Sequence, residues 1–256
     1  LYRWVAALTG SKNALKGIGF FLGGALLSTV GFGNAVGGMA IMLGVIAVST
    51  FFLLDRDLGK ATFKPKFNDL VSKSPRINCL SAARLFLFGS RDVWFVVALP
   101  VFLQLELGWS SVAVGTLLAV WVVGYGVIQA FSPSITGSHH GHPPDGGTAV
   151  KWGTVLTGLP LLIAGSFLLD VDPEWAVVVG LIIFGAVFAI NSSVHSYLII
   201  SYAESDGVSL DVGFYYMSNA AGRLVGTMCS GWVYQVWGFQ TCLLVSAGFV
   251  AAATFI

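Results

Sequence analysis

Residues 11–32 read SKNALKGIGFFLGGALLSTVGF, and residues 218–239 read SNAAGRLVGTMCSGWVYQVWGF. At an offset of 207 residues the two stretches share small residues, glycines, one cation and a closing Gly-Phe pair. The residues in register are Ser11 with Ser218, Ala14 with Ala221, Lys16 with Arg223, Gly19 with Gly226, Gly24 with Gly231, and Gly31-Phe32 with Gly238-Phe239. The repeat predicts that two helices of the chain are homologous, the alternative being a chance alignment of glycine-rich segments.

The composition places both stretches in a lipid bilayer. The chain of 256 residues is 56% hydrophobic and 10% charged, against about 25% charged in an ordinary globular domain. Its 32 glycines and 19 phenylalanines suit membrane helices, which pack through small residues and anchor through aromatic ones. A net charge of +1 provides no basic field for a nucleic acid. We expect an all-α polytopic membrane protein with the lipid bilayer, and no nucleic acid, as partner.

Apolar runs that could cross a hydrocarbon core of about 30 Å recur along the chain. We count about eight, near residues 4–30, 34–54, 79–103, 111–131, 150–169, 176–202, 212–235 and 239–256. The connection at residues 55–78 holds six of the thirteen basic residues, which predicts a cytoplasmic position by the positive-inside rule.

Homologous first and seventh spans on either side of a basic linker follow the plan of the major facilitator superfamily, which has two parallel six-helix repeats. On this plan residues 1–54 are the end of the N-terminal half (helices 5 and 6), and residues 55–78 are the cytoplasmic linker. Residues 79–256 are then the six-helix C-terminal half, with its last helix truncated. We therefore expect a longer protein, with four further helices upstream of Leu1.

Charge within the predicted spans is mostly positive. An intramembrane charge costs at least about 2.5 to 3.5 kcal/mol at a helix centre, so each one needs a partner or a purpose. The embedded cations are Lys12, Lys16, Arg84, Arg91 and Arg223, and Asp92 is the one well-embedded acid. Asp92 is a candidate for proton coupling, with a structural ion pair as the alternative. The excess of cations predicts a small anionic substrate.

Two of these cations lie on one helix face. Arg84 and Arg91 are seven residues apart, so their side chains project within about 20° of each other. Guanidinium groups match phosphate, arsenate or carboxylate oxygens in bidentate geometry. Arg84 lies near the predicted cytoplasmic helix end and could instead extend toward the interface, so we expect the loss of Arg91 to impair export more than the loss of Arg84.

Polar residues on other spans extend this candidate substrate site. Lys12 and Lys16 are four residues apart, and Asn219 and Arg223 have the same spacing. The pseudo-symmetry of the repeat predicts that both pairs face one central cavity, the alternative being that these cations neutralise helix ends or lipid phosphates. Asn191 and His195 form a third polar pair, which we expect at the cavity, a packing role for the histidine being the alternative.

Motifs for catalysis or metal binding are missing from the sequence. There is no Ser-His-Asp, HExxH, P-loop or paired-carboxylate arrangement, so we expect no enzyme activity, no cofactor and no metal. The tract at His139, His140 and His142 resembles a metal-binding tract weakly and is more simply a solvated loop. The spacing from Phe95 to Pro100 predicts a kinked and gating segment.

Longer strings resemble a known family. They are LYRWVAALTGSKNALKGIGFFLGGALL (residues 1–27), RDLGKA (56–61) with KPKF (64–67), LSAARLFLFGSRDVWFVVALPVFL (80–103) and WVVGYGVIQAFSPSITG (121–137). Together they resemble the organoarsenical efflux permeases of bacterial arsenic-resistance operons, a branch of the major facilitator superfamily. The likeness extends over most of the chain and is strongest from Leu1 to about Gly137.

The resemblance implies an efflux transporter of the bacterial cytoplasmic (inner) membrane that confers arsenate resistance. Its cargo would be 1-arseno-3-phosphoglycerate, formed when glyceraldehyde-3-phosphate dehydrogenase accepts arsenate in place of phosphate, which links the protein functionally to that enzyme. Such a multiply anionic cargo needs cationic donors rather than thiolate clusters, in keeping with only three cysteines. The alternatives are an exporter of another phosphorylated or carboxylated organic anion, and a facilitator-fold receptor that does not transport.

Overall fold

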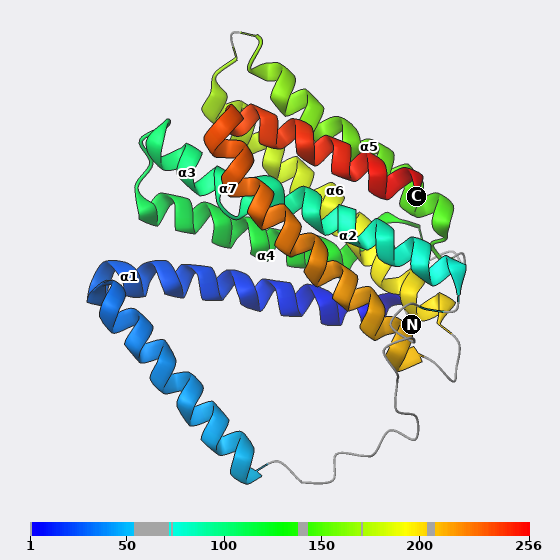
Figure 1. Cartoon of the computed structure of the whole chain (residues 1–256), viewed down its shortest axis with the longest axis horizontal. Helices are drawn as coiled ribbons and strands as arrows, with labels where there is room; N and C mark the ends of the chain where they lie inside the picture. The colour runs from blue at the N-terminus through cyan, green and yellow to red at the C-terminus, as the bar shows by residue number, and fades with distance from the viewer. Residues whose placement is uncertain (1, 54–71, 73, 138–142, 170, 204–207) are drawn as a thin grey trace.

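The computed structural model describes residues 2–53, 72, 74–137, 143–169, 171–203 and 208–256 (Figure 1). Over these ranges the regular structure is helical, which confirms the expected all-α class. The helices are α1 (Tyr2–Leu53), α2 (Pro75–Phe95), α3 (Ala98–Leu105), α4 (Ser111–Ile135), α5 (Gly146–Ser166), α6 (Pro173–Tyr202) and α7 (Val208–Phe255). The predicted basic linker, apart from its last few residues, and the three histidines of the His-rich tract lie outside the described residues.

Six segments of the described residues are long and apolar enough to cross a membrane, where the sequence suggested about eight. The difference comes from the two longest helices. Helix α1 bends at Gly31 (φ 77°, ψ 167°) and α7 bends at Gly238 (φ 79°, ψ −179°), so each contains two of the expected spans. The part of α1 before Thr29 is not among the six.

The two bends occupy equivalent positions in the internal repeat. Gly31 and Gly238 are the aligned glycines of the Gly-Phe pairs, and both adopt a positive φ that only glycine takes readily. Figure 1 shows that the first segment of α1 runs along α4, whereas the second leaves the bundle after the bend.

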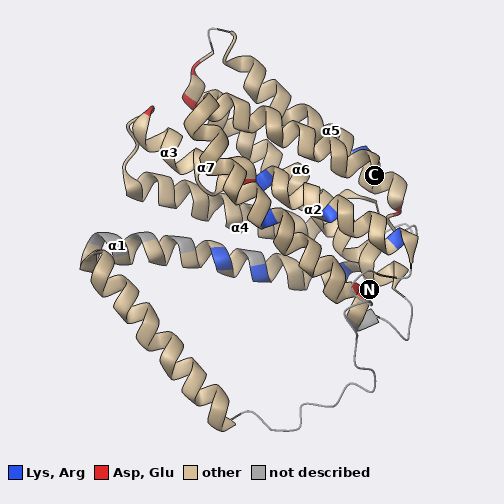
Figure 2. Cartoon of the chain, in the orientation of Figure 1, with Lys and Arg blue, Asp and Glu red and all other residues tan. Residues whose placement is uncertain are grey.

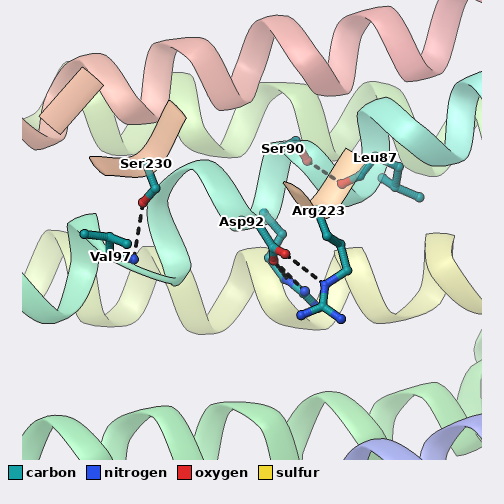
Figure 3. Close-up of polar contacts among 7 residues, drawn as sticks. Leu87, Ser90, Asp92, Val97, Arg223 and Ser230 are labelled. Carbon is teal, nitrogen blue, oxygen red and sulfur yellow. Dashed lines mark hydrogen bonds and ion pairs between the residues drawn. The ribbon is translucent and has the colours of Figure 1, made fainter. Parts of the chain in front are cut away.

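Helix α2 ends three residues after the fully buried Asp92, at the break that the Phe95-to-Pro100 spacing predicts. Pro100 has no N–H to donate to the carbonyl of Val96, and its ring would collide with that group, so the helix is interrupted and resumes as α3. The hydroxyl of Ser230, on α7, accepts from the freed backbone N–H groups of Val97 (3.3 Å) and Ala98 (3.0 Å), as Figure 3 shows for Val97. The break is thus satisfied inside the protein, as backbone at membrane depth must be.

Close contact between α2 and α7 positions the site. Gly222 and Gly226 face the backbone of Leu85 and Gly89, and a Cβ atom at either glycine would collide with a carbonyl oxygen. Such small residues allow helices to approach closely in a membrane. On α1 the equivalent role falls to Gly10 and Gly17, which contact α4.

Capping side chains fix the first residues of α5 and α6, and so determine where the preceding loops end. Asp145 caps α5, accepting a hydrogen bond from the backbone N–H of Thr148 at 2.8 Å, while the Thr148 hydroxyl completes a capping box. These hydrogen bonds, the backbone one first, hold the pKa of Asp145 below its ordinary value. Asp172 caps α6 in a similar manner, ahead of Pro173 at the first helical position.

Candidate functional site

A cavity of about 710 Å³ lies between α1, α2, α4, α6 and α7. Its volume is within the range of about 300 to 1,000 Å³ typical of small-molecule sites. Figure 2 shows that Lys and Arg residues lie along α1 and in the middle of the bundle, whereas most Asp and Glu residues lie toward the loops. All five embedded cations line the cavity: Lys12, Lys16, Arg84, Arg91 and Arg223.

The charge of the cavity is strongly unbalanced. Among the described residues, its lining combines five cations with a single carboxylate, that of Asp92, an excess of four positive charges. Like charges that share a site of low dielectric repel one another, and arginine cannot relieve this repulsion by losing a proton. An anion in the cavity would offset the excess.

Arg84 is the most deeply buried of these cations, with 3% of its surface exposed. Its Nη1 donates to the carbonyl and the hydroxyl oxygen of Ser192 on α6, both at 3.1 Å. The guanidinium carbon also lies 4.0 Å from the ring centre of Phe88 and 4.9 Å from that of Tyr215. Extension of Arg84 toward the membrane interface, the alternative that the sequence left open, is therefore wrong.

Arg91, Asp92 and Arg223 form an ion-pair triad. Arg91 Nε donates to Asp92 Oδ1 at 2.7 Å, and its Nη2 lies 2.5 Å from the same oxygen. Arg223 Nε on α7 donates to Asp92 Oδ2 at 3.0 Å, so one carboxylate holds cations from two helices (Figure 3). The Asp92 side chain is fully buried, whereas that of Arg223 is 48% exposed. Asp92 thus contacts the neighbouring helix α7 through Arg223 and also its own sequence neighbour Arg91.

The two i, i+4 pairs meet at this cavity. Lys12 and Lys16 line it from α1, and Asn219 and Arg223 line it from α7. The side-chain oxygen of Asn219 is buried and accepts no hydrogen bond from the described residues. The structure thus brings together the polar residues that the repeat aligns, and their role in binding a substrate stays a prediction.

Asn191 and His195 are placed differently from the expectation. Both are buried, with 2% and 3% of their surface exposed, and neither belongs to the described lining of the cavity. Ser192 lines it instead, because successive residues of a helix project about 100° apart and only one of these neighbours can face Arg84. The sequence identified the polar patch on α6, but it did not identify Ser192 as the residue of that patch that lines the cavity.

Aromatic residues of the site were not identified from the sequence. Phe88, Phe95, Trp121, Tyr125 and Tyr216 line the cavity. Trp121 and Tyr125 stack at 5.8 Å, and the indole N–H of Trp121 donates to the carbonyl of Leu181 at 2.7 Å. Their spacing of four residues was the available signal, but it is equally typical of ordinary packing residues.

Among the described residues no three His, Cys, Asp or Glu side chains gather as a metal-binding group. A family model described as Major Facilitator Superfamily matches residues 80–256. Neither the curated proteins nor the solved structures gave a match to the chain.

Proposed function

The chain belongs to the Major Facilitator Superfamily, whose members are transporters rather than enzymes, and we propose that this multi-pass membrane transporter exports an anionic organoarsenical. The observation that carries the proposal is the cavity lined by five cations and one carboxylate. Oxyanions are the ligands that guanidinium and ammonium groups hold most strongly. The proposed substrate class is therefore a small, multiply charged organic anion.

Arg84 supports this choice most clearly among the cations. It is buried, and its one described hydrogen-bonding partner, Ser192, is neutral. A buried cation without a nearby counter-charge is costly, and a transported anion would offset that cost whenever it occupies the cavity. The aromatic rings of Phe88 and Trp121 add apolar surface for the organic part of such an anion.

The specific cargo proposed is 1-arseno-3-phosphoglycerate, which the resemblance to organoarsenical efflux permeases implies. It carries two oxyanion groups, and it arises from glyceraldehyde-3-phosphate dehydrogenase acting on arsenate, so the transporter depends on that enzyme for its substrate. The proposed location is the bacterial inner membrane. Export of negative charge from a cell that is negative inside releases about 2.3 kcal/mol per charge at 100 mV.

The domain plan is part of this proposal. Residues 1–54 would be the last two helices of the N-terminal half, 55–78 the cytoplasmic linker and 79–256 the C-terminal half. The aligned bends at Gly31 and Gly238 support it, and four helices upstream would complete the cavity.

Co-expression tests the proposal. The full-length protein is produced together with the dehydrogenase in arsenate-sensitive cells, and growth and intracellular arsenic are measured under arsenate. We expect growth to be restored and cell arsenic to fall, with the Lys151→Gln variant, altered in an exposed lysine of α5, behaving like the parent. Arsenic accumulation equal to that of cells without the transporter would contradict the proposed cargo.

Export of another phosphorylated or carboxylated organic anion is the second candidate function, favoured by the aromatic lining of the cavity. Two assays distinguish this candidate from the first. Uptake of labelled 3-phosphoglycerate by everted vesicles, together with no gain of arsenate resistance in cells that produce the protein, would select the second candidate.

A further inference from the structure

Asp92 stands out among the residues of the cavity because it carries the charge of the expected substrate. Its side chain is fully buried, and it lines the same cavity as the cations. Its two oxygens are divided between two arginines, Oδ1 toward Arg91 and Oδ2 toward Arg223. A carboxylate in this position satisfies the same donors that an oxyanion of the substrate needs.

Contacts among the described residues show which guanidinium N–H groups of Arg91 and Arg223 are occupied by Asp92 and which are not. Asp92 occupies both Nε and Nη2 of Arg91, the edge of the guanidinium that binds carboxylates in bidentate fashion. On Arg223 it takes Nε alone, and the half-exposed side chain directs its terminal nitrogens away from Asp92 (Figure 3). A substrate oxyanion can therefore first contact Arg223, but it can use the bidentate edge of Arg91 only if Asp92 gives it up.

We propose that Asp92 is an internal competitor of the substrate, a carboxylate that holds Arg91 and Arg223 when the cavity is empty and that limits the affinity for the transported anion. This inference rests on the proposed function, because it assumes that an anion binds in this cavity. The advantage of such a residue is kinetic. A cavity with five cations and no carboxylate would retain a multiply charged anion, whereas a transporter must release it.

The position of Asp92 supports competition over simple structural pairing. The side chain is directly adjacent to the close α2–α7 contact, where Gly226 faces Gly89 and the Cβ atom of Asp92. It is thus held in place by packing, while the arginines that it binds retain exposures of 14% and 48%. The cations are the movable partners, and they can transfer from the fixed carboxylate to a ligand.

Equilibrium binding of labelled 3-phosphoglycerate to the purified full-length protein tests the inference. In the Asp92→Asn variant the affinity should rise about tenfold, because a charged competitor for two arginines is removed, and exchange transport in proteoliposomes should slow. Asp211→Asn is the matched control, since it removes a buried acid of α7 that bonds to Ser72 outside the cavity, and it should leave the affinity unchanged. Equal or weaker binding by Asp92→Asn would overturn the inference.

A second pair of variants covers the possibility that Asp92→Asn does not fold. Arg223→Gln is compared with the double variant Asp92→Asn/Arg223→Gln, in which one positive and one negative charge are removed together. The double variant should bind the probe more tightly than Arg223→Gln alone, because Arg91 is released, and the opposite order would overturn the inference. If the unaltered protein binds no 3-phosphoglycerate and no other organic anion, the proposed function fails instead.

Discussion

Arg84 on α2 donates two hydrogen bonds to Ser192 on α6, both at 3.1 Å, and so joins two helices at the deepest cation of the cavity. Ser192 is neutral, so the guanidinium keeps its full charge. This relationship distinguishes Arg84 from Arg91, whose charge is already opposed by Asp92.

The first prediction concerns the order of the two arginines. Arg84→Gln should lower anion export at least tenfold, and by more than Arg91→Gln does, because an anion gains more from a cation that no carboxylate shares. Initial rates of 3-phosphoglycerate uptake into everted vesicles measure this. The sequence alone suggested the opposite order, since it could not show that Arg84 is buried and that Arg91 is paired. A larger loss with Arg91→Gln would restore the sequence-based order.

The second prediction concerns the lysines of α1. Lys12→Gln and Lys16→Gln should each weaken binding of 3-phosphoglycerate by a few-fold and reduce its dependence on salt, because each removes an exposed charge of the cavity. Lys151→Gln, altered in an exposed lysine of α5 outside the described lining, is the control. If all three variants bind alike, α1 contributes no ligand.

The third prediction concerns the break between α2 and α3. Ser230→Ala removes the acceptor for the N–H groups of Val97 and Ala98 and should cost about 1 to 3 kcal/mol of stability. Thermal unfolding in detergent measures the loss. Ser246→Ala is a matched change, since Ser246 is buried on the same helix and its hydroxyl has no hydrogen-bond partner in the described structure. Equal unfolding temperatures for the two variants would show that Ser230 does not stabilise the break.

The fourth prediction concerns the α2–α7 contact. Gly226→Ala places a methyl group against the carbonyl of Gly89 and should destabilise the protein by about 1 to 3 kcal/mol. Gly231→Ala on the same helix meets no described atom within 4 Å and should be neutral or slightly stabilising. The same unfolding assay compares them, and a neutral Gly226→Ala would show that the helices can separate at this point.

Much of the fold could be predicted from the sequence because its signals are local. Apolar length defines the membrane segments, and Pro100 fixes the break after Phe95. The aligned Gly31 and Gly238 mark the two bends, although the positive φ angles that interrupt the helical geometry between consecutive expected spans are visible only in the structure.

The candidate site could be predicted only in part, for a physical reason. Charge in an apolar span is conspicuous, so all five cations of the cavity were found. The rotation of α6 about its axis has no such clear signal in the sequence. Asn191, Ser192 and His195 are all polar, and packing alone decides that Ser192 contacts Arg84. Trp121 and Tyr125 were missed because aromatic residues suit a cavity wall and a helix interface equally well.

Equilibrium binding of labelled 3-phosphoglycerate, compared with that of neutral glycerol, shows whether the cavity selects anions. We expect saturable binding of the anion by the purified full-length protein, no binding of glycerol, and a loss of at least tenfold in affinity with Arg84→Gln but not with Lys151→Gln. Binding that is unchanged in Arg84→Gln would contradict the claim that this cavity is an anion site.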